Sequence, residues 1–240
     1  MNRNAMEHLY STLRFIHIST GSLVMALGLI QILRPKHGAL HRTFGRMYYW
    51  LMLIVCTSAL TTSIYRIVKF GQPGAVFLTS VGIFGLYLVI TGYRMGKRKN
   101  RPANFTDKLI SICAIASALA LFATGIWVYT MGITFLLVVC CVFGFIQLMG
   151  ALVDYRFAFK GKVSDRFGPL SWKFTHLGRM IGSYIAATTA FLVNVNMIDY
   201  PLLNWLLPTV IGGFVIAGFT RYYARLHKVG RFAAPTNKPL

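Results

Sequence analysis

Acidic residues are scarce in this sequence. Only 5 of the 240 residues are Asp or Glu, and charged residues of both signs make up 12%. A soluble domain has about twice this charged fraction, so we expect an integral membrane protein. The five acids are also scattered along the chain, which gives little support to a hydrolase with paired carboxylates.

Motifs of metal sites and of soluble enzymes are missing as well. The four cysteines, Cys56, Cys113, Cys140 and Cys141, lie in apolar runs and have no C-x-x-C spacing. We therefore expect buried thiols. The sequence has no G-x-S-x-G, no phosphate-binding glycine loop and no H-E-x-x-H. Whether the chain is an enzyme stays open.

Long apolar runs cover most of the chain. A membrane-spanning helix needs about 20 apolar residues, and seven such spans can be placed between glycine, proline and polar breaks. The spans are 13–33, 45–68, 73–95, 108–130, 133–155, 173–195 and 202–224. We expect an all-α bundle of seven transmembrane helices, forming one domain over residues 1–240. No cleavable signal peptide is expected, since the first apolar run is long enough to span.

Basic residues are concentrated in alternate loops. Of the 25 Lys and Arg residues, all but Arg3, Arg14, Arg66 and Lys69 lie near one end of the predicted bundle. The positive-inside rule then predicts an inner-membrane protein with its N-terminus outside and its C-terminus in the cytoplasm. A net charge of +20 would suggest nucleic acid in a soluble protein. Here we expect the lipid bilayer as partner, with anionic lipids at the cytoplasmic surface and no nucleic acid.

Two parts of the chain share an order of glycines and polar residues. The first set is Gly28, Gln31, His41 and Gly45-Arg46-Met47, and the second is Gly144, Gln147, His176 and Gly178-Arg179-Met180. The copies are four spans apart, so they run in the same direction. This predicts a parallel repeat of spans one to three and five to seven about an axis along the membrane normal. Chance similarity of short strings is the alternative.

His41 and His176 are the main candidate metal ligands. Both lie at the cytoplasmic start of a span, and in paired repeats they would share one depth near the axis. Two neutral imidazoles on facing helices can ligate the iron of haem b, with Arg42, Arg46 and Arg179 near its propionates. The alternative is that these side chains meet lipid phosphates, as helix ends commonly do.

Other polar residues inside the spans also need partners, because an unpaired ionisable or amide group there is costly. His17 and Gln31 share one side of the first span, which predicts either a cofactor-lined interior or a helix-packing seam. Gln147 and Asp154 share one side of the fifth span. We expect Asp154 to pair with Arg156 or with an arginine of the first repeat.

Three stretches resemble the conserved blocks of a bacterial family of membrane proteins without assigned function, DUF2306. They are HISTGSLVMALGLIQILR, HRTFGRMYYW and HLGRMIGSYIAATTA. The matching positions are His17, Gly21, Gly28, Gln31, Arg34, His41, Arg42, Gly45, Arg46, Tyr48, His176, Met180, Ser183 and Tyr184. The last block departs from the family's usual HRRWM, since it reads HLGRM here. The resemblance implies a multi-span bundle and brings no known reaction.

Three functions follow as alternatives. The first is a b-type haem module that moves electrons between a quinone or another redox partner and the cytoplasmic surface, with His41 and His176 as ligands. The second is a transporter with its site between two parallel repeats. The third is a lipid-binding scaffold, in which each basic residue near the surface contributes about 1 kcal/mol of attraction to anionic head groups. The oligomeric state is not predicted.

Overall fold

The computed structural model is an all-helical bundle, described over residues 3–99, 101–161 and 165–233. Its long helices are α1 (Arg3–Leu33), α2 (Gly38–Phe70), α3 (Pro73–Arg98), α4 (Phe105–Thr130), α5 (Thr134–Lys160), α6 (Ser171–Val195) and α7 (Pro201–Leu226). Two short 3₁₀ segments, η1 (Asp165–Leu170) and η2 (Gly230–Phe232), follow α5 and α7. The all-α prediction is confirmed, and the seven helices match the seven predicted segments.

Six helices of the described chain are long and apolar enough to cross a membrane, and α6 falls short of that composition. The difference arises because α6 contains Lys173, His176 and Arg179 within its first half. A helix with such a content needs protein partners, since lipid cannot solvate these groups. In the structure, α6 packs against α1, α3 and α7.

The helices are longer than the predicted apolar spans because their polar ends remain helical. The largest extensions are at α1 and α2. Helix α2 begins at Gly38, which places His41 and Arg42 inside its first turns. It ends at Gly71, whose φ of 58° suits a residue without a side chain. The extension matters for function, because a helical His41 points in a direction fixed by the rest of α2.

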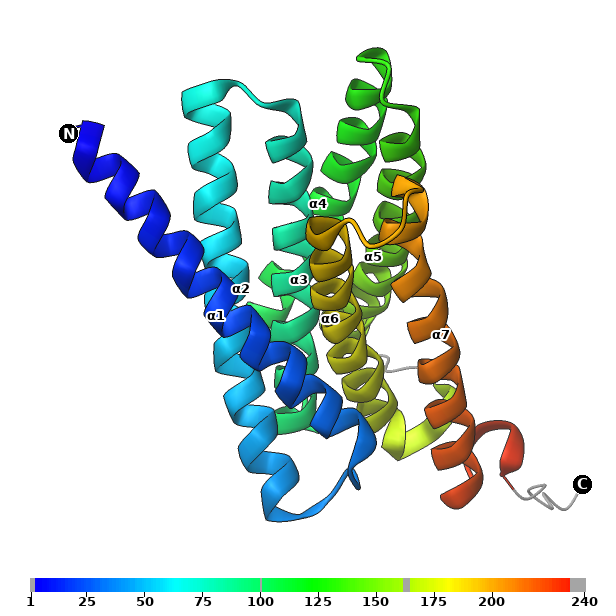
Figure 1. The fold of residues 1–240 in the computed structure, drawn as a ribbon. Helices are drawn as coiled ribbons and strands as arrows, with labels where there is room; N and C mark the ends of the chain where they lie inside the picture. The colour runs from blue at the N-terminus through cyan, green and yellow to red at the C-terminus, as the bar shows by residue number, and fades with distance from the viewer. Residues whose placement is uncertain (1–2, 100, 162–164, 234–240) are drawn as a thin grey trace, which may run out of the picture.

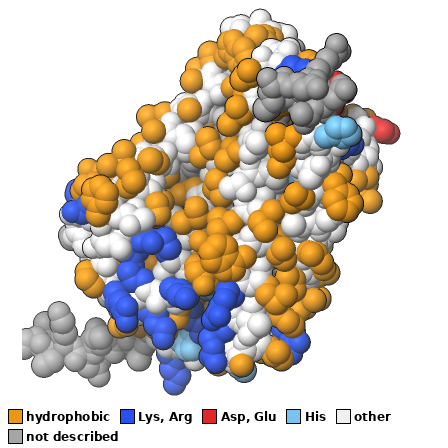
Figure 2. Space-filling model, turned by 90° about the vertical axis from the view of Figure 1, so that its left-hand side faces the viewer, with side chains coloured by type: hydrophobic (Ala, Val, Ile, Leu, Met, Phe, Trp, Pro, Cys, Tyr) orange, Lys and Arg blue, Asp and Glu red, His pale blue; other side chains and the backbone are white. Residues whose placement is uncertain are grey.

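Consecutive helices run in opposite directions along the bundle, with the N-terminus at the top and the C-terminus at the bottom of Figure 1. Helix α1 packs along α2, α4 packs along α5, and α3 contacts α2, α4 and α6. We call the lower end, with the α1–α2, α3–α4 and α5–α6 connections, the basic end. In Figure 2, Lys and Arg side chains gather at the lower end of the visible face, and hydrophobic side chains cover much of the surface above.

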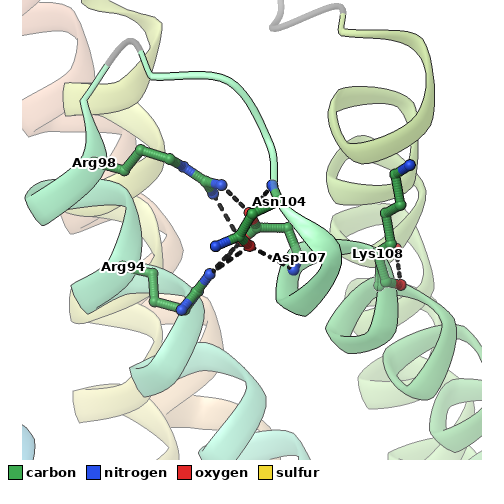
Figure 3. A network of polar contacts seen from close by, with 6 residues as sticks. Arg94, Arg98, Asn104, Asp107 and Lys108 are labelled. Atoms are coloured by element: carbon green, nitrogen blue, oxygen red, sulfur yellow. Dashed lines mark hydrogen bonds and ion pairs between the residues drawn. The ribbon is translucent and has the colours of Figure 1, made fainter.

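At the basic end, a buried carboxylate holds α3 to α4 (Figure 3). Asp107 accepts hydrogen bonds from Arg94 Nη2, at 3.0 Å, and from Arg98. Asp107 also forms a reciprocal capping box with Asn104 at the start of α4, which satisfies two free amides of that helix. The charges of Arg94 and Arg98 are therefore engaged inside the protein. Other basic residues of this end face a cavity, described next.

Candidate functional site

His41 is held by Gln31, which reaches across from the last turn of α1. The Nε2 atom of Gln31 donates to the backbone oxygen of His41 at 2.9 Å, and its Oε1 lies 3.1 Å from His41 Nδ1. The first contact fixes the amide orientation, because an amide oxygen cannot donate to a carbonyl. Oε1 must then accept from Nδ1–H. In the neutral ring, Nε2 of His41 therefore carries the free lone pair.

His176 is oriented in the same way by the backbone of α3. Its Nδ1 lies 2.7 Å from the carbonyl oxygen of Gly92 and must donate, because a carbonyl only accepts. Gly92 and Gly96 let α6 approach this closely. A Cβ at Gly96 would lie 2.7 Å from Nδ1 of His176, and one at Gly92 would lie 2.9 Å from Cβ of Arg179. This is the small-residue spacing that allows membrane helices to pack tightly.

The two imidazoles line one cavity of about 620 Å³, formed by α1, α2, α3 and α6 with a contribution from α7. We call it the basic cavity. Within the described residues, the Nε2 atoms of His41 and His176 have no hydrogen-bond partner in the protein. Histidines that bind metals commonly donate their other N–H to a carbonyl or a carboxylate. Both rings of the basic cavity have this arrangement.

The lining of the basic cavity has a strongly positive charge. Six cations line it, namely Lys36, Arg42, Arg46, Lys97, Lys99 and Lys173, and no Asp or Glu is among its described lining residues. Three of these ammonium groups lie over aromatic rings of the cavity lining, 4.8 to 5.9 Å from the ring centres. The rings belong to Tyr93, Trp172 and Tyr223, which also line the cavity. The arrangement favours an anionic ligand with apolar surface.

Lys36 has a second role at this cavity. Its Nζ donates to the backbone oxygens of Gln31, Ile32 and Arg34, at 2.5 to 2.9 Å. It thus satisfies carbonyls at the end of α1, where a cation also suits the helix dipole. Burial lowers the pKa of the Lys36 ammonium below its ordinary value. Lys36 therefore holds the turn that brings Gln31 to His41.

The inner part of the basic cavity joins α2 to α6. The hydroxyl of Tyr48 lies 3.0 Å from Ser183 Oγ, which itself donates to the backbone oxygen of Met180. Tyr48 must then donate to Ser183. A Cβ at Gly28 would lie 2.2 Å from the ring of Tyr184, so glycine is required where α1 passes α6. These contacts connect residues of the first and last blocks of the family resemblance.

The structure brings most of the predicted site residues to the basic cavity. His41, His176, Gln31, Arg42 and Arg46 all line it. The sequence interpretation missed the contribution of α3 and the residue after it, which provide Tyr93, Gly96, Lys97 and Lys99. The Gly92-x3-Gly96 spacing was the signal that could have predicted close packing of α3 against another helix.

Arg179 does not belong to this cavity, although we expected it near the propionates. It lies on the other side of the α3–α6 contact from His176, and its Nη2 donates to Asp154 Oδ2 and to the backbone oxygen of Gly150, both at 2.9 Å. The same Asp154 oxygen accepts from Tyr87 OH at 2.5 Å. The expectation that Asp154 pairs with Arg156 or an arginine of the first repeat was wrong, because α5 and α6 bring Arg179 to it.

His17 and Gln147 also lie away from the basic cavity. His17 Nδ1 contacts Val55 O at 3.1 Å and Ser58 Oγ at 3.0 Å, so it ties α1 to α2 higher in the bundle. Gln147 is buried between α5 and α4, where its Nε2 donates to Ala114 O and to Ser117. Both side chains have the helix-packing contacts that were the alternative to a cofactor-lined interior.

Together, these features define a multi-span helical membrane protein with paired imidazoles in a basic cavity at one end. The chain belongs to the family described as predicted membrane protein (DUF2306), whose model matches residues 14–153. The matched segment includes Gln31, His41 and Arg46 but ends before α6 and His176. No curated protein and no solved structure matches the chain. The family resemblance from the sequence is confirmed.

Proposed function

We propose that this protein is a b-type haem protein of the membrane, in which His41 and His176 would hold the iron. One observation carries the proposal. The two imidazoles line the same cavity, and each has its Nδ1–H engaged by the protein and its Nε2 lone pair without a partner in the described structure. Two such nitrogens can ligate the iron of a b-type haem.

The rest of the basic cavity supports the same ligand. A volume of about 620 Å³ is in the range of cofactor pockets. Gly28, Gly45 and Gly96 at its lining let the side chains of Tyr184, Gln31 and His176 pack close against the neighbouring helices. Arg42 and Arg46 can neutralise two carboxylates, and they replace Arg179 in that role.

Haem b, when bound, accepts and donates one electron at a time. The protein's own contribution is to hold both imidazoles in one tautomer through Gln31 and Gly92, and to compensate the negative charge of the ligand. Hydrogen-bond acceptors that hold the other N–H of a ligating histidine fix the orientation of its ring and raise the basicity of the ligating nitrogen. A quinone or another redox partner would complete the electron transfer.

We also propose the membrane arrangement that goes with this function. All seven helices span, with α6 shielded from lipid by α1, α3 and α7. The basic end faces the cytoplasm of a cell with an inner membrane, and the N-terminus lies outside. The haem site would then lie at the cytoplasmic side of the bilayer.

The experiment is an absorption spectrum of protein purified in detergent from haem-replete cells. We expect a Soret band and a reduced-minus-oxidised spectrum of a six-coordinate haem. His41→Ala and His176→Ala should each lose it, and imidazole in the buffer should restore part of it. His17→Ala is the matched control, because His17 is half-buried and hydrogen-bonded but lies outside the cavity. Colourless wild-type protein that does not take up added hemin would overturn the proposal.

The six cations of the basic cavity favour a second candidate, the binding of an anionic phospholipid. Native mass spectrometry separates the two functions. A phospholipid ligand predicts bound phosphatidylglycerol, loss of that lipid in Arg42→Ala and Arg46→Ala, and no effect of His41→Ala. A haem ligand predicts that His41→Ala loses the bound ligand.

Transport between two parallel repeats stays a prediction that we do not develop. The matched glutamines have different partners, since Gln31 contacts His41 of the following helix and Gln147 contacts α4. Helix α1 packs along α2, whereas α5 packs mainly along α4. The proposed haem site therefore does not depend on a repeat.

A further inference from the structure

A second cavity, of about 460 Å³, lies between α3, α5, α6 and α7. We call it the Arg179 cavity. Helix α6 separates it from the basic cavity, because His176 and Met180 line one and Arg179 and Gly182 line the other. Ile146 and Val153 of α5 line the Arg179 cavity and are also exposed on the outside of the bundle. The cavity is therefore open to the apolar part of the bilayer beside α5.

Arg179 supplies the polar group of this otherwise apolar cavity. Its side chain is only 10% exposed, and its charge is balanced by Asp154. The hydrogen bonds that it donates to Asp154 and to Gly150 both come from Nη2, and the ring of Tyr87 covers one side of the guanidinium, 4.5 Å from its carbon. The N–H groups of Nε and Nη1 are left to donate. Gly150 and Gly178 also line the cavity, and Gly150 has no side chain to cover the guanidinium. A Cβ at Gly150 would lie 2.6 Å from Nη1.

The remaining polar groups indicate which ligand chemistry suits the cavity. Thr175 and Thr189 use their hydroxyl hydrogens on backbone oxygens of their own helix. Thr209 of α7 also lines the cavity. Arg179 is thus the charged donor that faces the space, and a ligand should present an acceptor to it. The ligand should also be neutral, since the Arg179–Asp154 pair already has no net charge. The basic cavity differs on this point, because its cations have no acidic counterpart among its described lining residues.

We propose that the Arg179 cavity binds a lipid-soluble quinone. A quinone is neutral, dissolves in the bilayer and presents ring carbonyls that can accept from Arg179. Its apolar tail matches the lining of Phe84, Phe143 and Ile185 and can leave past the exposed residues of α5. The inference concerns binding alone and does not require that the basic cavity holds haem.

Two glycines allow a direct test. Gly178 and Gly213 line the cavity, and a Cβ at either would meet no atom within 4 Å apart from its chain neighbours and the nearby backbone of its own helix. Gly178→Leu and Gly213→Leu should therefore fill the cavity without a collision in the helix. Gly218→Leu is the control, because Gly218 is on α7, has the same free space and does not line the cavity.

The probe is decylubiquinone, titrated into the full chain in phosphatidylcholine nanodiscs while tryptophan fluorescence is recorded. We expect saturable quenching, an affinity lower by roughly tenfold or more in both cavity variants, and wild-type affinity in Gly218→Leu. Decylbenzene, which has the tail without carbonyls, should bind at least about tenfold more weakly. Arg179→Lys, which keeps the charge opposite Asp154, should also weaken quinone binding.

Three results would overturn the inference. They are non-saturable quenching, equal binding of decylbenzene and the quinone, and a phospholipid that stays in the cavity and is not displaced. The outcome is separable from that of the haem proposal. Colourless protein that binds decylubiquinone would refute the haem and leave the quinone site standing, and coloured protein without saturable binding would do the opposite.

Discussion

The Nδ1 atom of His176 lies 2.7 Å from the backbone carbonyl oxygen of Gly92, across the contact between α6 and α3. This hydrogen bond fixes both the tautomer and the direction of the ring. It exists because α3 has glycine at positions 92 and 96, where any side chain would collide with residues of α6. The function of the basic cavity therefore depends on backbone packing as well as on the histidines themselves.

The first prediction concerns Gly96→Ala. The added methyl group would lie 2.7 Å from His176 Nδ1, so the ring must move or α3 and α6 must separate. We expect a loss of about 1–3 kcal/mol of stability and a reduced haem content. Thermal unfolding and the Soret absorbance per chain measure the two effects. Gly218→Ala, with free space at its Cβ, should change neither. Normal haem content in Gly96→Ala would contradict the role given to this contact.

A second prediction compares the half-buried Gln31 with the buried Gln147. Gln31→Leu removes the acceptor that holds His41 Nδ1–H. Loss of a hydrogen-bond partner of a ligating histidine costs about 10- to 100-fold in metal affinity. We expect weaker haem retention and a shifted midpoint potential. Gln147→Leu is the control, since Gln147 contacts α4 and no part of the cavity. Hemin titration and redox titration provide the readouts. Equal effects of the two variants would mean that Gln31 acts only in packing.

The third prediction concerns the buried pair of Asp154 and Arg179. Removal of one partner leaves an uncompensated charge, at a cost of about 3–5 kcal/mol. Asp154→Leu and Arg179→Met should each be strongly destabilising. The double variant should lose much less than the sum, because both charges are then absent. Unfolding in a denaturing detergent series measures all three. Additive losses would show that the pair is not coupled in the way its 2.9 Å contact indicates.

The fourth prediction concerns topology. With the basic end in the cytoplasm, a C-terminal green fluorescent protein fusion should fluoresce, and a C-terminal alkaline phosphatase fusion should be inactive. The same reporters placed in the α2–α3 connection, at Gln72, should give the opposite pattern. An active phosphatase at the C-terminus would reverse the orientation and place the basic cavity outside.

The positions of the helices could be predicted from the sequence, whereas the neighbours of each helix could not. Apolar runs and glycine or proline breaks locate all seven segments, because the bilayer sets both length and composition. These features do not locate the neighbours of each helix, as Arg179 illustrates. It follows His176 by three residues, which suggests one side of a helix. Helix α3 packs between them, since Gly92 approaches both side chains, and the two residues end in different cavities.

The candidate site could be predicted only where its residues are close together in the sequence. His41 and Gln31 are ten residues apart on neighbouring helices, so a short turn brings them together. The cations of α3 at positions 97 and 99 were counted only as part of a basic loop. Their place in the cavity depends on the α3–α6 contact, which spans more than 70 residues of sequence. In the sequence, only the glycine spacing indicates long-range packing of this kind.

The most direct test of the central claim is the number of haem groups per chain, measured by extraction and a pyridine haemochrome assay on purified protein. The proposal predicts one haem b per wild-type chain, the same value for His17→Ala, and a value near zero for both His41→Ala and His176→Ala. Absence of haem from wild-type protein after hemin reconstitution would contradict the proposal. Full haem content in both His41→Ala and His176→Ala would also contradict the proposal.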